Sequence, residues 1–148
     1  MFQAVEKILL TLWVGGMWTA GYVVAPVLFK QLDRMTAGNV AGQLFTIISY
    51  IGLVALLVVL LLAVMQIGVR ALRQWRYRIV LIMLLLVVIE QFGLQPVMVE
   101  LKTAGLQGSN ARQFASLHAV ASILYLVNSV LGLVLVVWRT RPQNWMRD

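Results

Sequence analysis

Glu90 is a carboxylate in the middle of an apolar stretch. It is the only charged residue between Ile79 and Val99 and lies 11 residues into that stretch, which is about 16 Å along a helix rising about 1.5 Å per residue. If the stretch spans a membrane, an ionised carboxylate at that depth costs roughly 3 kcal/mol on insertion scales. We therefore expect Glu90 to be protonated, or to face other helices and their polar side chains. Its role is either to bind a proton or small ligand, or to make an interhelical hydrogen bond worth about 0.6–2 kcal/mol.

Amide side chains are the predicted partners of Glu90. Gln91 and Gln95 lie beside it in the sequence, four residues apart, so a helix would present both on one side. Asn128 lies ten residues before Trp138 in the last apolar stretch, or about 15 Å from the same membrane boundary. The similar depth predicts contact between Glu90 and Asn128.

The last apolar stretch also carries a polar stripe. Residues spaced i, i+4, i+7 and i+11 lie on one face of a helix, and this spacing is met by His118, Ser122, Tyr125 and Ser129. With Asn128 beside this face, we expect a ligand pocket that opens outward. His118 would lie at its mouth. The alternative is that the serine and tyrosine hydroxyls bridge helices while His118 rests among lipid headgroups.

The sequence lacks the residue sets of common enzymes. It has no Cys and one His, which leaves no disulfide, thiolate nucleophile or cysteine metal site. No Ser–His–Asp set is evident, and no HExxH, P-loop or GxGxxG pattern occurs. An enzyme is therefore the less favoured class. The residues specify no metal and no cofactor, although His118 leaves haem open.

Four apolar stretches must position these residues. The AVILMFWYC set makes up 61% of the 148 residues and charged residues make up 11%, against about 45–50% and about 25% in soluble domains. This composition excludes an ordinary soluble domain, a disordered tail and a nucleic-acid binder. Each stretch reaches the roughly 20 residues that cross a membrane as a helix. The hydrocarbon core offers the backbone no hydrogen-bond partners, so we expect each stretch to form a helix, in which the backbone groups bond to one another.

The predicted fold is an all-α membrane protein, a four-transmembrane-helix up-down bundle that forms a single integral membrane domain over residues 1–148. The spans are expected at about residues 6–29, 46–69, 79–99 and 117–138. The second apolar stretch, Met35–Val69, is longer than one span. Its start, Met35–Gln43, is expected to form a separate interfacial turn or short helix. The first span is too long for a signal peptide, and we expect it to be retained.

Basic residues divide unequally between the two ends of such a bundle. Eight lie on the side of the termini and the middle connection, and four lie on the other side, namely Lys30, Arg34, Lys102 and Arg112. The positive-inside rule then places both termini in the cytoplasm. Because the middle connection combines arginine with aromatic residues, we expect it to contact anionic lipid headgroups rather than nucleic acid. Its interface residues are Arg70, Arg73, Trp75, Arg76, Tyr77 and Arg78.

The first span carries a pattern of small residues. They recur four positions apart at Gly16 and Ala20, and again at Gly21 and Ala25. This spacing lets helix backbones approach one another closely. We therefore expect these four residues to pack against a neighbouring helix.

The two halves of the chain share a faint pattern. Pro26 and Pro96 each precede a valine near the outer end of an odd-numbered span. This predicts a possible parallel duplication of two helical hairpins, related by a pseudo-twofold axis along the membrane normal; chance similarity is the alternative. The interval from Pro26 to Pro96 also separates Lys30 from Glu100, which makes these two residues equivalent. We expect them to pair near the outer interface, where such a pair contributes about 0–1 kcal/mol.

Longer strings of this sequence are similar to a known family. They are WVGGMWTAGYVVAPVLFKQLDRMTAGNVAGQLF, QPVMVELKTAG and FASLH, and they resemble the bacterial domain-of-unknown-function 4149 family, related to eukaryotic transmembrane protein 205. The positions that carry the resemblance include Pro26, Phe29, Gly42, Phe45, Pro96, Leu117 and His118. The resemblance implies a four-span helical membrane protein without an established biochemical activity. We expect it to lie in the bacterial inner membrane.

These patterns leave three classes of function open. The leading hypothesis is a non-enzymatic binder or transporter of a small ligand, a proton or a metal ion, in a polar cleft between the third and fourth spans. Glu90 would titrate there, Asn128 and Gln91 would position the ligand, and His118 would guard the outer mouth. The alternatives are a structural or accessory membrane subunit with no ligand, and a membrane redox protein that binds haem or quinone. Assembly with a second copy or with another membrane protein is also open.

Overall fold

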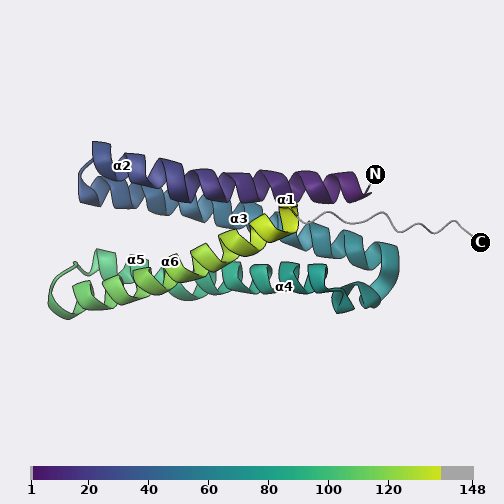
Figure 1. Ribbon diagram of the computed structural model, residues 1–148. Coiled ribbons are helices and arrows are strands. Elements are labelled where there is room, and N and C mark those ends of the chain that lie inside the picture. The colour runs from purple at the N-terminus through teal and green to yellow at the C-terminus, as the bar shows by residue number, and fades with distance from the viewer. Residues whose placement is uncertain (1, 138–148) are drawn as a thin grey trace, which may run out of the picture.

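Four helices that are long and apolar enough to cross a membrane build the part of the protein that the structure describes (Figure 1). The computed structural model describes residues 2–137. The four helices are Gln3–Gln31, Arg34–Arg73, Trp75–Thr103 and Gly108–Val137. Within the described residues there is no strand, so the predicted all-α fold with four membrane-length helices is confirmed. The predicted end of the last span at residue 138, and the basic residues after it, lie outside the described residues.

The first membrane helix contains a widened turn. Its consecutive parts are α1 (Phe2–Thr19), a π-helical turn (Ala20–Val24) and α2 (Ala25–Gln31). The Ala25 amide donates to the Ala20 carbonyl, five residues back. Pro26 follows at once, and because it has no amide hydrogen it cannot continue the α-helical ladder. The widened turn carries the helix past this proline without ending it.

The helix α3 (Arg34–Ile67) is continuous. The prediction that Met35–Gln43 forms a separate turn or short helix is therefore wrong. The Asp33 carboxylate caps the helix by accepting two backbone amides of the first turn, both at 3.0 Å. Two small residues of this segment, Ala37 and Ala41, are buried, so the small side chains favour close packing instead of a break.

The second half of the chain repeats the pattern of the first. A 3-10 turn (Gly68–Arg73) leads into the third membrane helix, whose parts are α4 (Trp75–Val88), a π-helical turn (Ile89–Leu94) and α5 (Gln95–Thr103). The Gln95 amide donates to the Glu90 carbonyl, again five residues back, and Pro96 follows. Gln95 and Glu90 therefore occupy the same positions relative to Pro96 that Ala25 and Ala20 occupy relative to Pro26. The last helix is α6 (Gly108–Val137).

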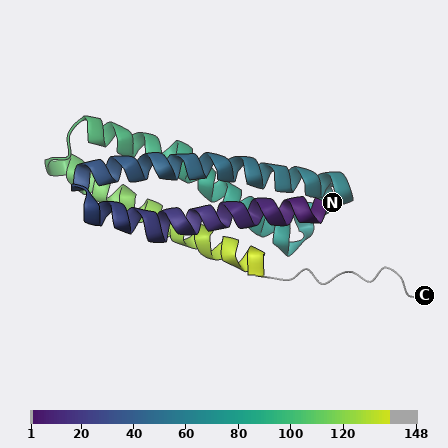
Figure 2. The same ribbon diagram turned by 90° about the horizontal axis from the view of Figure 1, so that it is seen from above.

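The packing of the helices shows the same repeat. α1 packs against α3 and α6, and α4 packs against the same two helices. Exchanging α1 with α4 and α3 with α6 leaves these contacts unchanged, as expected for two hairpins related by a pseudo-twofold axis. Figures 1 and 2 show the start of α1, the end of α6 and the α3–α4 connection at one end of the bundle, which we call the termini end. The α2–α3 and α5–α6 connections lie at the opposite, distal end.

The core lies on the inner faces of these helices. Leu10, Trp13 and Met17 of α1 are buried, and so are the residues at the equivalent positions of α4, namely Val80, Met83 and Val87. Large apolar side chains cover much of the outer surface, where Leu12 and Leu61, for example, are 69% and 59% exposed. An apolar exterior of this extent fits a protein that is surrounded by lipid.

A glycine makes room for the tryptophan of the core. A Cβ atom on Gly52 of α3 would lie 2.3 Å from Nε1 of Trp13. The same indole nitrogen donates to the Ile48 carbonyl at 3.1 Å. Only a residue without a side chain lets α1 and α3 meet at this point.

The small residues predicted to pack in the first membrane helix face two different helices. A Cβ on Gly16 would lie 3.3 Å from Ile48 of α3. A Cβ on Gly21 would lie 2.6 Å from the Tyr125 ring of α6. The two alanines of the pattern are inside or partly inside the bundle, with Ala20 buried and Ala25 half-buried.

Candidate functional site

A small cavity lies between the four membrane helices. Its volume is about 10 Å³, which is near the smallest space that holds one water molecule. Each of the four helices contributes to its walls, which are formed by Trp13, Met17, Ile48, Ser49, Val87, Glu90, Tyr125 and Asn128. Glu90 and Asn128, which the sequence predicts to be partners, therefore line the same cavity from the third membrane helix and from α6.

The two predicted partners lack hydrogen-bond donors. Glu90 Oε1 and Asn128 Oδ1 are both buried, and neither accepts a hydrogen bond. Asn128 is only 1% exposed, so surface solvent does not reach its side chain. A buried acceptor left unsatisfied costs about 1–3 kcal/mol. As the amide is oriented, both atoms are acceptors, and a protonated carboxyl group or a water molecule would supply the missing hydrogen. With the amide turned by 180°, its own NH2 group would supply it.

The backbone around Glu90 is also unusual. Glu90 lies in the second π-helical turn, and its carbonyl accepts the hydrogen bond that closes this turn. Such turns are frequent at functional sites. The equivalent residue of the first half is Ala20, which is buried. The two halves thus share the backbone feature, while only the second half places a carboxyl group there.

Tyr125 closes one side of the cavity. Its hydroxyl donates to the Met17 carbonyl at 2.5 Å, and its ring meets Phe45 edge to face at 5.2 Å between centroids. Because this hydroxyl hydrogen is donated to α1, it is not free to bond to Glu90. The bond instead fixes the Tyr125 ring as a wall of the cavity.

The two glutamines beside Glu90 do not line the cavity. Gln91 is half-buried. Gln95 Nε2 lies 3.5 Å from Oγ1 of Thr46 in α3, at the limit of a hydrogen bond. Since Gln95 is five residues from Glu90, this polar pair is about 7.5 Å closer to the distal end.

The predicted pocket with His118 at its mouth is not formed. His118 and Ser122 are exposed; the Ser122 hydroxyl donates to the His118 carbonyl at 2.8 Å, and the His118 ring stacks on Phe114 at 5.9 Å. His118 lies ten residues, or about 15 Å, from Asn128 along α6, and Ser122 lies six residues, or about 9 Å, from it. Both are on the distal side of the cavity, and neither lines it.

The last member of the polar stripe, Ser129, lies between α1 and α6. Its hydroxyl is 2.9 Å from that of Tyr22, and its carbonyl accepts from Trp18 Nε1 at 3.2 Å. The rings of Trp18 and Tyr22 are 4.8 Å apart. These contacts hold two helices together, as the bridging alternative for this stripe predicts.

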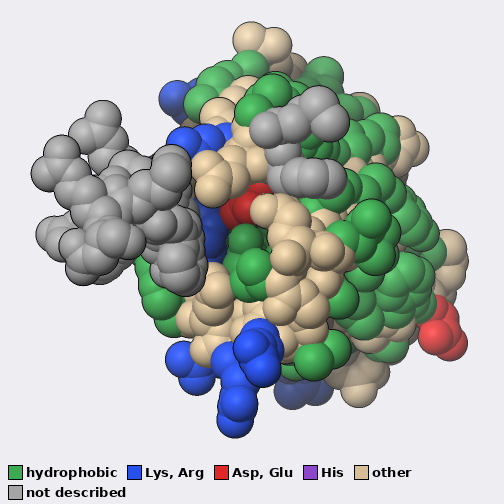
Figure 3. All heavy atoms as spheres, turned by 90° about the vertical axis from the view of Figure 1, so that its right-hand side faces the viewer, with side chains coloured by type: hydrophobic (Ala, Val, Ile, Leu, Met, Phe, Trp, Pro, Cys, Tyr) green, Lys and Arg blue, Asp and Glu red, His purple; other side chains and the backbone are tan. Residues whose placement is uncertain are grey.

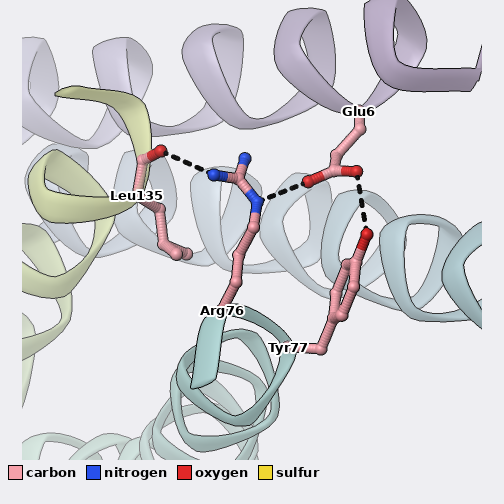
Figure 4. Close-up of polar contacts among 4 residues, drawn as sticks. All are labelled: Glu6, Arg76, Tyr77 and Leu135. Atoms are coloured by element: carbon pink, nitrogen blue, oxygen red, sulfur yellow. Dashed lines mark hydrogen bonds and ion pairs between the residues drawn. The ribbon is translucent and has the colours of Figure 1, made fainter. Parts of the chain in front are cut away.

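A buried ion pair lies at the termini end, where sequence reasoning did not place one. Arg76 Nε is 2.8 Å from Glu6 Oε1, and both residues are 8% exposed. Figure 4 shows the guanidinium of α4 between the Glu6 carboxylate of α1 and the Leu135 carbonyl of α6, to which Nη1 donates at 3.3 Å. The Tyr77 hydroxyl donates to the other Glu6 oxygen at 3.4 Å.

Arg76 therefore departs from its predicted place at the lipid interface. Its neighbours Arg70, Arg73 and Arg78 are exposed, and Trp75 is 42% exposed. Arg76 turns inward because Glu6 supplies a buried counter-charge, which a solvated arginine does not need. In Figure 3, Lys and Arg side chains lie around this end of the molecule.

The predicted pair of Lys30 and Glu100 is not formed. Both residues are exposed, and the one ion pair within residues 2–137 is that of Glu6 and Arg76. Residues related by a twofold axis meet only where they lie on that axis. Glu6 and Arg76 do so, whereas the exposed Lys30 and Glu100 lie away from it.

An apolar layer separates the two polar sites. Arg76 and Glu90 are fourteen residues apart along the third membrane helix, or about 21 Å. The buried residues between them include Trp13, Met83, Leu56 and Val59. The Glu90 cavity is therefore closed toward the termini end.

Comparison with known proteins identifies one family. No curated protein and no solved structure matches this chain. A family model described as a domain of unknown function, DUF4149, matches residues 8–107. The matched part includes Glu90 and ends before Asn128, and the relation to transmembrane protein 205 stays a prediction. Because the match covers more than half of the sequence, the chain belongs to the DUF4149 family.

Proposed function

We propose that this membrane protein is a non-enzymatic proton binder, in which Glu90 takes up a proton and Asn128 holds the protonated group. The observation that carries the proposal is the pair of buried acceptors, Glu90 Oε1 and Asn128 Oδ1, at one cavity without a donor. A proton on Glu90 creates an O–H group that donates to Asn128, directly or through one water molecule. It also removes the cost of a charge in the membrane, roughly 3 kcal/mol.

The size of the cavity favours a proton over a larger ligand. About 10 Å³ has no room for an organic molecule, so neither haem nor quinone fits at this site. Within the described residues, no group of three His, Asp, Glu or Cys side chains comes together that would hold a metal ion. A proton needs only the carboxyl group and its partner.

The surroundings favour exchange of the proton with the distal end. Gln95 and Thr46 form a polar pair on that side of Glu90. On the other side the apolar layer blocks the path to Arg76. If transport occurs, this layer must open in a second conformation, as alternating access requires.

The positive-inside rule supports a cytoplasmic termini end. We accordingly place the protein in the bacterial inner membrane with both termini inside and the Glu90 cavity exchanging protons with the outer side. Arg70, Arg73 and Arg78 are exposed at the termini end, where anionic headgroups would attract them by about 1 kcal/mol each. We also predict that this end contacts lipid, that the protein does not bind nucleic acid, and that it assembles with a second copy.

A structural role is the second candidate. The bonds from Trp13 to Ile48 and from Trp18 to Ser129 join helices and involve no ligand. If Glu90 acted in the same way, its proton would be fixed for as long as the protein stayed folded.

Infrared spectroscopy of the reconstituted protein distinguishes the two candidates. The carbonyl stretch of a protonated carboxyl group should be present in the wild type and in Glu100→Gln, which removes an exposed carboxylate of the same membrane helix, and absent in Glu90→Gln. The proposal predicts that the band disappears reversibly as the pH is raised. A band that stays constant while the protein remains folded, or that persists in Glu90→Gln, would contradict proton binding at Glu90.

A further inference from the structure

An open groove runs along the distal part of α6, beside α5. Its volume is about 630 Å³, and its walls are Val97, Ser109, Arg112, Gln113, Ser116 and Leu117. This volume is in the range of ligand sites, about 300–1,000 Å³. The groove shares no residue with the Glu90 cavity, so its role is independent of the proton site.

One wall of the groove is a polar face of α6. Ser109, Arg112 and Ser116 follow the helical spacing i, i+3 and i+7, with Gln113 next to Arg112. The Ser116 hydroxyl already donates to the Arg112 carbonyl at 3.1 Å. The guanidinium, the Gln113 amide and the Ser109 hydroxyl are therefore the groups that can donate to a ligand.

Arg112 gives the groove a positive charge without a counter-charge. It is exposed, and within the part of the chain that the structure describes no carboxylate forms an ion pair with it. The nearby cation of α5 is engaged elsewhere, because Lys102 Nζ donates to the Gly38 carbonyl at 3.4 Å and lies 5.5 Å from the Phe114 ring centroid. A free guanidinium is suited to bidentate binding of phosphate oxygens.

The order of polar and apolar residues follows the layers of a membrane. α6 has 30 residues, or about 45 Å, against a hydrocarbon core of about 30 Å, so about 7 Å at each end reaches the headgroup layer. Arg112 lies four residues, or about 6 Å, from the start of α6. Leu117 lies five residues deeper, about 7.5 Å further in, and Val97 of α5 joins it in the groove.

We propose that this groove binds one membrane phospholipid with an anionic headgroup. The lipid phosphate lies on Arg112, with Gln113 and Ser109 donating to the headgroup, and the first part of an acyl chain packs against Leu117 and Val97. A dissolved phosphate ion would use only the polar wall and leave Leu117 and Val97 uncovered, which is why a lipid is the better occupant.

The test is a lipid titration of the purified full chain in neutral detergent. Native mass spectrometry measures the fraction of protein that carries phosphatidylglycerol or phosphatidylcholine. We expect phosphatidylglycerol to bind more tightly, and Arg112→Gln to weaken its binding about fivefold, the loss of about 1 kcal/mol for one cation near a lipid surface. Arg112→Lys should keep most of the affinity. The matched control is Arg34→Gln, which removes an exposed arginine of the distal end outside the groove and should change nothing.

Three results would overturn the proposal. Equal losses in Arg112→Gln and Arg34→Gln would mean that general surface charge attracts the lipid. Equal binding of both lipids without any effect of Arg112→Gln would mean that the groove does not distinguish an anionic headgroup from a zwitterionic one. Full displacement of phosphatidylglycerol by inorganic phosphate at matched concentration would mean that the site takes a free anion.

Discussion

Glu6 and Arg76 are equivalent residues of the two halves of this protein, and they bind each other. They are 70 residues apart in sequence and 2.8 Å apart at Oε1 and Nε. The same offset relates Ala20 to Glu90 in the two π-helical turns. Since equivalent residues can touch only at the pseudo-twofold axis, the ion pair marks where that axis leaves the bundle at the termini end.

Exchange of the two charges tests this symmetry. Glu6→Arg or Arg76→Glu alone should destabilise the protein by about 3–5 kcal/mol, because each leaves like charges buried together. The double variant should regain much of the loss, since the guanidinium at position 6 would approach the Met65 carbonyl of α3, the equivalent of the Leu135 carbonyl. Thermal unfolding in detergent measures the effect, with exposed Arg78→Gln as the control. A double variant no more stable than the single ones would contradict the symmetric environment.

Replacing either of two glycines in α3 by alanine should change the stability of the protein, in opposite directions for the two positions. Gly52→Ala places a Cβ 2.3 Å from Trp13, and overpacking of this kind costs about 1–3 kcal/mol. Gly42→Ala meets nothing within 4 Å and should stabilise the helix by up to about 1 kcal/mol. Unfolding midpoints of the two variants decide the point. Equal effects of both would show that Trp13 does not pack as described.

The prolines should control the π-helical turns. Pro96→Ala restores an amide hydrogen, so the turn around Glu90 can contract to α-helical geometry and move the carboxyl group in its cavity. Pro26→Ala makes the same change in the first half, where the equivalent residue is Ala20 and the turn carries no carboxyl group. We expect the infrared carboxyl band of Glu90 to shift in Pro96→Ala and to stay in place in Pro26→Ala. Identical spectra for both variants would contradict the link between the turn and the site.

The cap of α3 should make part of the stability pH-dependent. Hydrogen bonds from Thr36 hold the pKa of Asp33 below its usual value of 3.8. Because the folded pKa is lowered, the contribution is present at neutral pH and is lost as the pH falls through the lowered pKa. Asp33→Ala should lower the unfolding midpoint at neutral pH, while Asp33→Asn keeps a capping oxygen. The wild type and Asp33→Asn should then converge in acid, and a constant difference would refute the role of the charge.

Composition and depth are enough to predict the helices and to bring two residues, Glu90 and Asn128, to one cavity. Four charge-poor stretches predict four membrane helices because each is long enough to cross the hydrocarbon core and must satisfy its backbone hydrogen bonds there. Glu90 and Asn128 share a cavity because their depths, counted from the same boundary, match. The continuity of α3 does not follow from the sequence, because small residues such as Ala37 are equally compatible with a break and with tight packing.

The remaining contacts depend on how far a cavity extends along a helix and on pairing over long distances. His118 and Ser122 share a helical stripe with Tyr125, yet only Tyr125 lines the cavity, since a stripe shows a common face and not where along that face a cavity lies. Arg76 sits among exposed arginines and aromatic residues, so its sequence surroundings are typical of a lipid interface. The sequence does contain a signal for the Glu6–Arg76 pair, namely the repeat, because the interval from Glu6 to Arg76 equals the interval from Pro26 to Pro96.

The hydrogen bond that we propose between Glu90 and Asn128 is tested most directly by the carbonyl stretch of the Glu90 carboxyl group in wild type and in Asn128→Leu. Glu90→Gln assigns the band. We predict a band in both proteins, shifted to higher frequency in Asn128→Leu because the carboxyl group has lost its hydrogen-bond acceptor. A band at the same frequency in both proteins would contradict the pairing.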